Sequence, residues 1–345
     1  MNLNTKNSRI LSFDIIRIAA VLMVIMIHTA MDFTKYDTGS FSYLSGNIFD
    51  SMARAGVPLF VMVSGALLLD EKKEISINKI FSKYIFNIVF LFVIWSCIYS
   101  LIDIVKGMLT GHTPGFGNIL HNFITGSFHM WYLMMIIGLY LTLPVLKLFV
   151  KSENSKIIVY TISLSLVFMF LPQLLSSLFG FGNVFVQISA WLTSFKYGFI
   201  GVFPTYFITG WYVKYIGIKH KKTVYLSSVI SVLLIILLVQ TTGNYSEVYS
   251  NSNILVYLYS LGIFTFINDV SGNKSSSAVV TKLSDLTFGV YIVHIIVLYG
   301  LDLFFKPAVL TPLSIIIKFC LITVISFAGS YILSKIPGLK KLVRF

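Results

Sequence analysis

An arginine and a histidine lie inside one apolar stretch near the start of the chain, residues 13–28. Ionisable groups within a membrane-spanning helix cost about 2.5 kcal/mol or more at the bilayer centre, so they usually face a protein interior or a wet cavity. Arg17 and His28 are eleven positions apart, which on a helix places them within about 20° of one face and about 16 Å apart along the axis. Asp14 lies about one turn from Arg17 and is expected to be its ion partner. The alternatives are that Arg17 extends to the headgroups and that His28 is a packed, hydrogen-bonded histidine.

Four further polar positions lie inside apolar runs. Arg54 is expected near the outer end of the second span, where it either extends to the headgroups or steadies an anionic or developing-oxyanion group. His294 is a site candidate or a packed histidine. Ser64, followed by glycine, either allows close helix packing or acts as a nucleophile. Lys318 lies about one turn inside the last span and is expected to reach the outer interface.

The composition is that of an integral membrane protein. Of 345 residues, 57% are hydrophobic and 11% charged, and the mean hydropathy is +0.87, whereas a soluble chain carries about a quarter charged residues. We therefore predict an all-α polytopic protein forming a single membrane domain over residues 1–345, with about ten spans of the usual length. The expected spans are 10–31, 52–69, 84–105, 130–146, 157–178, 197–213, 224–239, 254–267, 288–304 and 313–333.

The distribution of basic residues predicts the orientation. With ten spans and a cytoplasmic N-terminus, 19 of the 26 Lys and Arg residues fall in cytoplasmic segments and four in outer segments, as the positive-inside rule requires. Both termini are therefore expected in the cytoplasm. The net charge of +13 is explained by topology, so no nucleic acid partner is expected. Cys97 and Cys320 lie in apolar runs and the histidines follow no metal-ligand spacing, so no metal is expected.

The order of these motifs resembles the acyltransferase-3 family, the ten-helix membrane acyltransferases that modify cell-surface glycans. Arg17, ten residues and His28 are similar to that family's Arg-X10-His motif in the first helix. Residues 56–65, which end in Ser64-Gly65, resemble its second motif. Two later segments, 130–133 and 288–294, are similar to its Trp-Tyr/Phe-Leu and Tyr-X-X-His segments. The resemblance spans about residues 10–335.

What the resemblance implies is acyl transfer from cytoplasmic acyl-coenzyme A, with acetyl as the first expectation, to a hydroxyl of a cell-surface or lipid-linked glycan. His28 would be the general base and Arg17 would orient the donor. The inner residues Lys79 and Lys83 would attract the donor's phosphates. The residues expected to bind substrate are Arg54, Asp14, Ser64, His294, His129, Trp131 and Tyr132.

Two departures from the family pattern and two other function classes remain. Ala66 stands where an aromatic residue often follows Ser-Gly, and lysines replace the arginines that the family often has at 79 and 83. A transporter or flippase would use Arg17, His28 and Arg54 to bind an anion or relay protons, although no matching broken helices mark two halves of the chain. A catalytically inactive scaffold of a polysaccharide export complex is the third possibility. Direct transfer is the expected mechanism, with an acyl-enzyme intermediate as the alternative.

Overall fold

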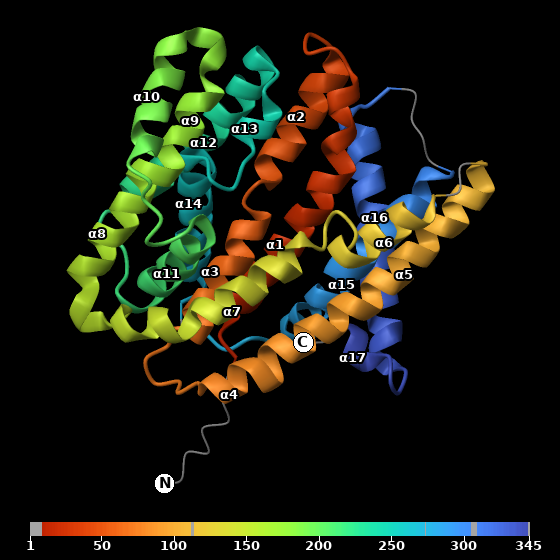
Figure 1. The fold of residues 1–345 in the computed structure, drawn as a ribbon, viewed down its shortest axis with the longest axis horizontal. Coiled ribbons are helices and arrows are strands. Elements are labelled where there is room, and N and C mark those ends of the chain that lie inside the picture. The colour runs from red at the N-terminus through yellow and green to blue at the C-terminus, as the bar shows by residue number, and fades with distance from the viewer. Residues whose placement is uncertain (1–8, 112–113, 273, 305–308, 344–345) are drawn as a thin grey trace. The chain divides into compact units, whose positions relative to one another are not determined.

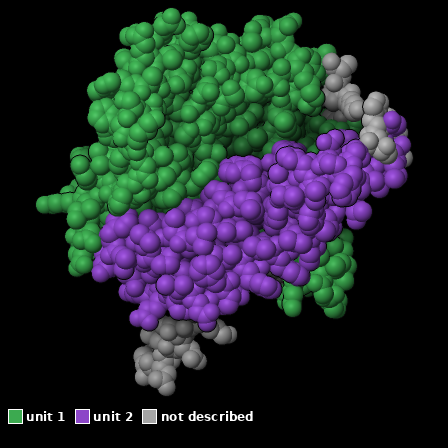
Figure 2. All heavy atoms as spheres, viewed as in Figure 1, with its two compact units in different colours: residues 1–70, 152–344 green, residues 71–151, 345 purple. Residues whose placement is uncertain are grey.

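The computed structural model describes residues 9–111, 114–272, 274–304 and 309–343. The chain divides into two compact units, coloured separately in Figure 2: unit 1 comprises Met1–Asp70 and Ser152–Arg344, and unit 2 comprises Glu71–Lys151. Each unit is described by itself. The prediction of one membrane domain over residues 1–345 stays a prediction.

The described chain is 81% helical and none of it lies in a β-strand, so the all-α prediction is confirmed (Figure 1). One isolated antiparallel bridge pairs Ile10 with Ser275. The helices of unit 1 are α1 (Leu11–Ala30), η1 (Met31–Lys35), α2 (Phe41–Ala53), α3 (Gly56–Leu68), α8 (Ser155–Ser165), α9 (Leu171–Ser177), α10 (Asn183–Ser194), α11 (Val202–Tyr215), α12 (Lys221–Thr242), α13 (Tyr245–Val248), α14 (Ile254–Ser271), α15 (Ala278–Asp302), α16 (Pro312–Lys335) and α17 (Lys340–Val343). Those of unit 2 are α4 (Ile77–Lys79), α5 (Phe86–Thr110), α6 (Phe116–Thr125) and α7 (Trp131–Phe149).

Nine helical segments in the described residues are long and apolar enough to cross a membrane, and the polytopic prediction is confirmed. Ten spans were predicted, and the one that is absent from these nine is residues 197–213. There α11 has 14 residues, which is about 21 Å of helix and less than the roughly 30 Å hydrocarbon core. The cytoplasmic placement of both termini stays a prediction, because it requires that α11 and the residues before it also cross.

The second span begins earlier than predicted. Helix α2 starts at Phe41 rather than at residue 52, and a short turn at Arg54 and Ala55 separates it from α3. The buried face of α2 is largely polar and includes Ser45, Asn47 and Ser51. A search for apolar runs therefore misses it.

Side chains and glycines mark the helix ends. The hydroxyl or amide oxygens of Ser40, Asn253, Ser277 and Thr311 accept hydrogen bonds from the first-turn amides of α2, α14, α15 and α16, as N-caps do. Gly243 ends α12 with φ +66, a left-handed conformation that glycine adopts without steric cost. These local signals explain where the helices that carry the polar residues begin and end.

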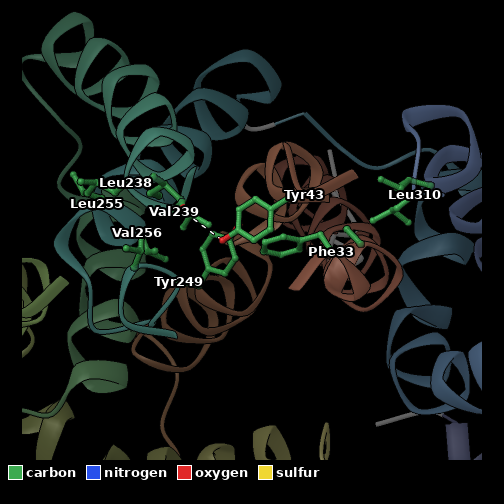
Figure 3. Close-up of a cluster of buried hydrophobic side chains, with 12 residues drawn as sticks. Phe33, Tyr43, Leu238, Val239, Tyr249, Leu255, Val256 and Leu310 are labelled. Carbon is green, nitrogen blue, oxygen red and sulfur yellow. Dashed lines mark hydrogen bonds between the residues drawn. The ribbon is translucent and has the colours of Figure 1, made fainter. Parts of the chain in front are cut away.

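An aromatic cluster fixes the segment that follows α1 (Figure 3). Phe33 of η1 lies edge-on to Tyr43 of α2, with 4.9 Å between ring centroids, and is fully buried. The Tyr43 hydroxyl donates to the carbonyl of Val239 in α12 at 3.2 Å. Tyr249 completes the aromatic group, with its ring centroid 6.2 Å from that of Phe33. Because these side chains join η1, α2 and α12, the last turn of α1 is held by packing as well as by the backbone.

Helices α3 and α11 cross in close contact through two glycines. A Cβ at Gly65 would overlap the Phe207 carbonyl of α11, and one at Gly210 would overlap the Met62 carbonyl of α3. Small residues at such crossings let helix backbones approach one another. This confirms the packing interpretation of the Ser-Gly motif.

Gly65→Ala is expected to destabilise the protein by about 1–3 kcal/mol, because the new methyl group must push two packed backbones apart. The matched control is Gly138→Ala in α7, where an added Cβ meets nothing within 4 Å and helix propensity alone favours alanine. Thermal unfolding in detergent measures both variants. Equal melting temperatures for the two would contradict the close crossing.

Candidate active site

Two histidines from distant parts of unit 1 meet. His28 lies in the last turn of α1 and His294 in α15, and their ring centroids are 5.3 Å apart with planes at 34°. His294 is fully buried, whereas His28 is only partly buried. The structure therefore brings the two sequence-predicted histidines together, with His28 as the more accessible.

A hydrogen bond determines the protonation of the His294 ring. Its Nδ1 lies 2.6 Å from the carbonyl oxygen of Tyr291. Since a carbonyl can only accept, Nδ1 must carry a proton, and in the neutral ring Nε2 is then the acceptor nitrogen. The late Tyr-X-X-His segment thus places the tyrosine one helical turn before the histidine, where its backbone orients the ring.

Helix α1 is central to this arrangement because it contacts α2, α3, α14, α15 and α16. Ile16, Ala20, Val21 and Ile25 are fully buried. Without glycine or proline, α1 is a continuous 20-residue helix that carries Asp14, Arg17 and His28 at fixed separations.

At the start of α1, one buried carboxylate is shared by two arginines. Asp14 is 1% exposed and lies 3.2 Å from Arg9 and 3.9 Å from Arg17. The hydroxyl of Ser276 also donates to it, and Arg9 pairs in addition with Asp285. The predicted Asp14–Arg17 ion pair is confirmed, whereas a role of either residue toward substrate stays a prediction.

Sequence analysis did not identify Arg9, Ser276 or Asp285 as part of this group. The Ile10–Ser275 bridge brings Ser276 and Asp285 to Asp14 and Arg9 from a segment more than 260 positions away, and no spacing in the sequence signals it.

Arg54 lies in a buried polar group. Its guanidinium pairs with Asp50, which is 1% exposed, and lies 3.9 Å from the ring centroid of Tyr249. Burial and the nearby Asp50 raise the pKa of the Tyr249 hydroxyl well above its usual value. That hydroxyl donates to the Asn47 side chain at 2.8 Å. The i,i+4 spacing of Asp50 and Arg54 is a signal that the sequence offers, but the predicted span began after Asp50.

The contacts of α1 place Arg54 at a level between Arg17 and His28. Gly46 of α2 lies against Phe33, and a Cβ on Gly56 of α3 would be 3.0 Å from the Ala20 carbonyl. Helices α2 and α3 therefore run antiparallel to α1. On a linear scale between these two contacts, Arg54 lies about midway between the levels of Arg17 and His28, roughly one and a half turns from each.

The hydroxyl of Ser64 donates to the Phe60 carbonyl at 2.9 Å, within its own helix. This bond is a common one for a helical serine and supports the packing interpretation. The assignment of Ser64 to substrate binding stays a prediction.

The other predicted site residues belong to unit 2. His129 precedes α7, is 2% exposed and lies edge-on to Tyr99 of α5 at 5.0 Å. Trp131 and Tyr132 open α7, and the Trp131 side chain is exposed. Lys79 and Lys83 are exposed, at the end of α4 and in the π-helical turn (Ile80–Ile85) that follows it. Their roles toward glycan and coenzyme A stay predictions.

Comparison with known families identifies the class of protein. The model of the acyltransferase-3 family, described as an acyltransferase domain, matches residues 10–335. Because the match covers nearly the whole chain, this protein belongs to the acyltransferase-3 family and is a multi-pass membrane O-acyltransferase. The resemblance stated from the motifs is confirmed. No curated protein and no solved structure matches the chain.

Arg54→Met is expected to lower the free energy of unfolding by about 3–5 kcal/mol, because it leaves the buried Asp50 carboxylate uncompensated. The double variant Arg54→Met/Asp50→Asn removes both charges and is expected to recover most of that loss. Denaturant unfolding in detergent compares the two. Equal destabilisation of the single and double variants would show that the ion pair is not what stabilises this region.

Proposed function

We propose that this acyltransferase moves an acyl group, acetyl in the first instance, from cytoplasmic acyl-coenzyme A to a hydroxyl of an extracytoplasmic or lipid-linked cell-surface glycan. The observation that carries the proposal is the His28–His294 pair, whose ring centroids are 5.3 Å apart and in which His28 lies on the helix that also carries Arg17. A base inside a helix bundle, with a guanidinium about 16 Å away along the same helix, suits a reaction between two substrates that arrive from opposite ends.

His28 is the general base in this mechanism, because the fully buried His294 offers less access to a substrate. An imidazole nitrogen of His28 takes the proton of the acceptor hydroxyl as the oxygen attacks the thioester carbon. The tetrahedral intermediate then expels the coenzyme A sulfur, which receives the proton from the imidazolium. The products are the glycan ester and free coenzyme A, and no proton is gained or lost. His294 supports the His28 ring and Arg54 steadies the developing oxyanion.

The donor binds at the Arg17 end of α1. Three cations lie near two carboxylates there: Arg17 and Arg9 pair with Asp14 and Asp285, and the Lys214 ammonium lies 5.3 Å from the ring centroid of Phe13 on α1. Such a concentration of cations attracts the phosphates of coenzyme A. In unit 2, the exposed lysines Lys79 and Lys83 are proposed to attract the coenzyme A phosphates in their own right. The excess of basic residues at this end supports a cytoplasmic position.

The acceptor is bound by polar and aromatic side chains. His129, Trp131 and Tyr132 of unit 2 offer ring faces and hydrogen-bonding groups of the kind that hold sugars. Asp14, which lies beside Arg17 on α1, and Ser64 of α3 would contact the donor instead. The lipid bilayer surrounds the bundle and presents a lipid-linked sugar from the side.

His28→Ala is expected to lower the rate of acyl transfer about 10²–10⁴-fold, the usual contribution of a general base. Acceptor-dependent release of coenzyme A by purified protein in proteoliposomes measures the rate, and mass spectrometry of surface glycans from cells with each variant measures the product. The control is His220→Ala, which changes an exposed histidine and should leave both unchanged.

Two results would contradict the proposal. Transfer at the normal rate by correctly inserted His28→Ala protein would show that His28 is not the general base. Substrate movement across the vesicle membrane without any release of coenzyme A would instead identify a transporter.

A further inference from the structure

The side chain of Lys318 is buried in the membrane helix α16, and the prediction that it reaches the outer interface stays a prediction. The residue is 5% exposed. Its ammonium lies 2.6 Å from the carboxylate of Asp302 and 4.0 Å from that of Asp32. A lysine within a span is costly unless it is paired, and these two carboxylates supply the pairing.

The two carboxylates come from the ends of the two helices that carry the histidines. Asp32 follows His28 by four residues, in the 3-10 turn η1 that continues α1. Asp302 follows His294 by eight residues and is the last residue of α15. One side chain of α16 therefore joins α1 to α15 just beyond the histidine pair.

Asp32 also has a second cation, which provides an internal comparison. Lys35 lies 2.6 Å from it, but the Lys35 side chain is 72% exposed, against 7% for Lys318. Exposed ion pairs contribute little because water screens them. The Lys318 ammonium is buried although its partner Asp302 is 35% exposed, so loss of the partner carboxylates leaves a buried charge uncompensated. Lys318 is thus the strong link of this group and Lys35 the weak one.

Such a link matters in a bilayer because apolar helix surfaces slide past one another without a hydrophobic penalty. Polar contacts and close packing then determine how far one helix is displaced along the next. Helices α15 and α16 already interlock where Gly289 lies against Ser330, whose hydroxyl donates to the Leu286 carbonyl at 3.1 Å. That contact fixes α15 on α16 near the C-terminal end of α16. Near the N-terminal end of α16, Lys318 joins α1 to the other two helices, at the end of the bundle where the histidines lie.

We propose that Lys318 is a positioning residue for acyl transfer, which holds His28 and His294 at the separation that the reaction requires. The inference rests on the proposed function of the histidine pair. Lys318 acts through Asp32 and Asp302 on the two helices, and it does not touch the reacting atoms.

The kinetic test uses the double variant Lys318→Met/Asp302→Asn, which removes the buried charge together with its nearest partner, so that folding is preserved. We expect kcat to fall by about 100-fold, the usual effect of a displacement of about 1 Å at a reacting centre. The KM for acyl-coenzyme A should not change, because the donor is proposed to bind at the start of α1, whereas Lys318 contacts Asp32 after the end of that helix. Lys318→Arg should retain most of the activity, and Lys35→Met, the matched control on the same carboxylate, should retain all of it.

A second measurement reports the separation of the helices without catalysis. In protein with Cys97→Ser and Cys320→Ser, the replacements His28→Cys and His294→Cys allow bridging by a short bis-methanethiosulfonate reagent. We expect the bridging rate to fall at least several-fold when Lys318→Met/Asp302→Asn is added, and to stay unchanged with Lys35→Met.

The results separate this inference from the proposed function. Unchanged bridging, or full kcat in the folded double variant, would overturn the positioning role while leaving His28 as the base. A loss with Lys35→Met as large as that of the double variant would also overturn it. The two experiments can also disagree. If bridging slows in the double variant but His28→Ala protein still transfers acyl groups, Lys318 does link the helices and His28 is not the general base.

Discussion

The free-energy cost of placing ionisable groups within membrane-spanning helices constrains the arrangement of unit 1. Three buried carboxylate or ammonium groups each have an opposite charge from the same or another segment: Asp14 with Arg9 and Arg17, Asp50 with Arg54, and Lys318 with Asp302. Because an unpaired buried charge is strongly destabilising, these pairs restrict which helices can be neighbours. Helix α1 contacts the segments that contribute to all three groups, and it carries the candidate base. The polar residues therefore organise the bundle as well as the site.

The three groups lie at different levels along α1. Asp14 and Arg17 lie near its start, Arg54 lies beside its middle, and Asp32 follows its end. A helix of 20 residues is about 30 Å long, which matches the hydrocarbon thickness of a bilayer. One continuous helix thus connects a basic end, where we propose that the donor binds, to the candidate base His28 near the opposite end. This arrangement fits the proposed reaction, in which donor and acceptor reach the site from different sides of the membrane.

Much of the fold and part of the site were predictable from the sequence. Apolar runs gave most of the spans, and helical periodicity gave the common face of Arg17 and His28. Helix α2 escaped detection because its buried face is largely serine, asparagine and aspartate, which hydropathy counts as exposed. The pairing of His28 with His294, and of Lys318 with Asp302, depends on which helices pack together. A single sequence carries no signal for that, since lipid-facing and protein-facing apolar surfaces have the same composition. Pairs within one stretch of chain are different: the spacing of Asp14 and Arg17 predicted their ion pair, and the spacing of Asp50 and Arg54 was visible although their pair was not predicted.

The central claim is that His28 and His294 act as one unit, and a double-mutant cycle on the transfer rate tests it most directly. Residues that act as a unit are strongly non-additive. The account predicts that His28→Ala/His294→Ala loses no more activity than His28→Ala alone. If the two losses multiply in the double variant, the histidines act independently and the proposed site is wrong.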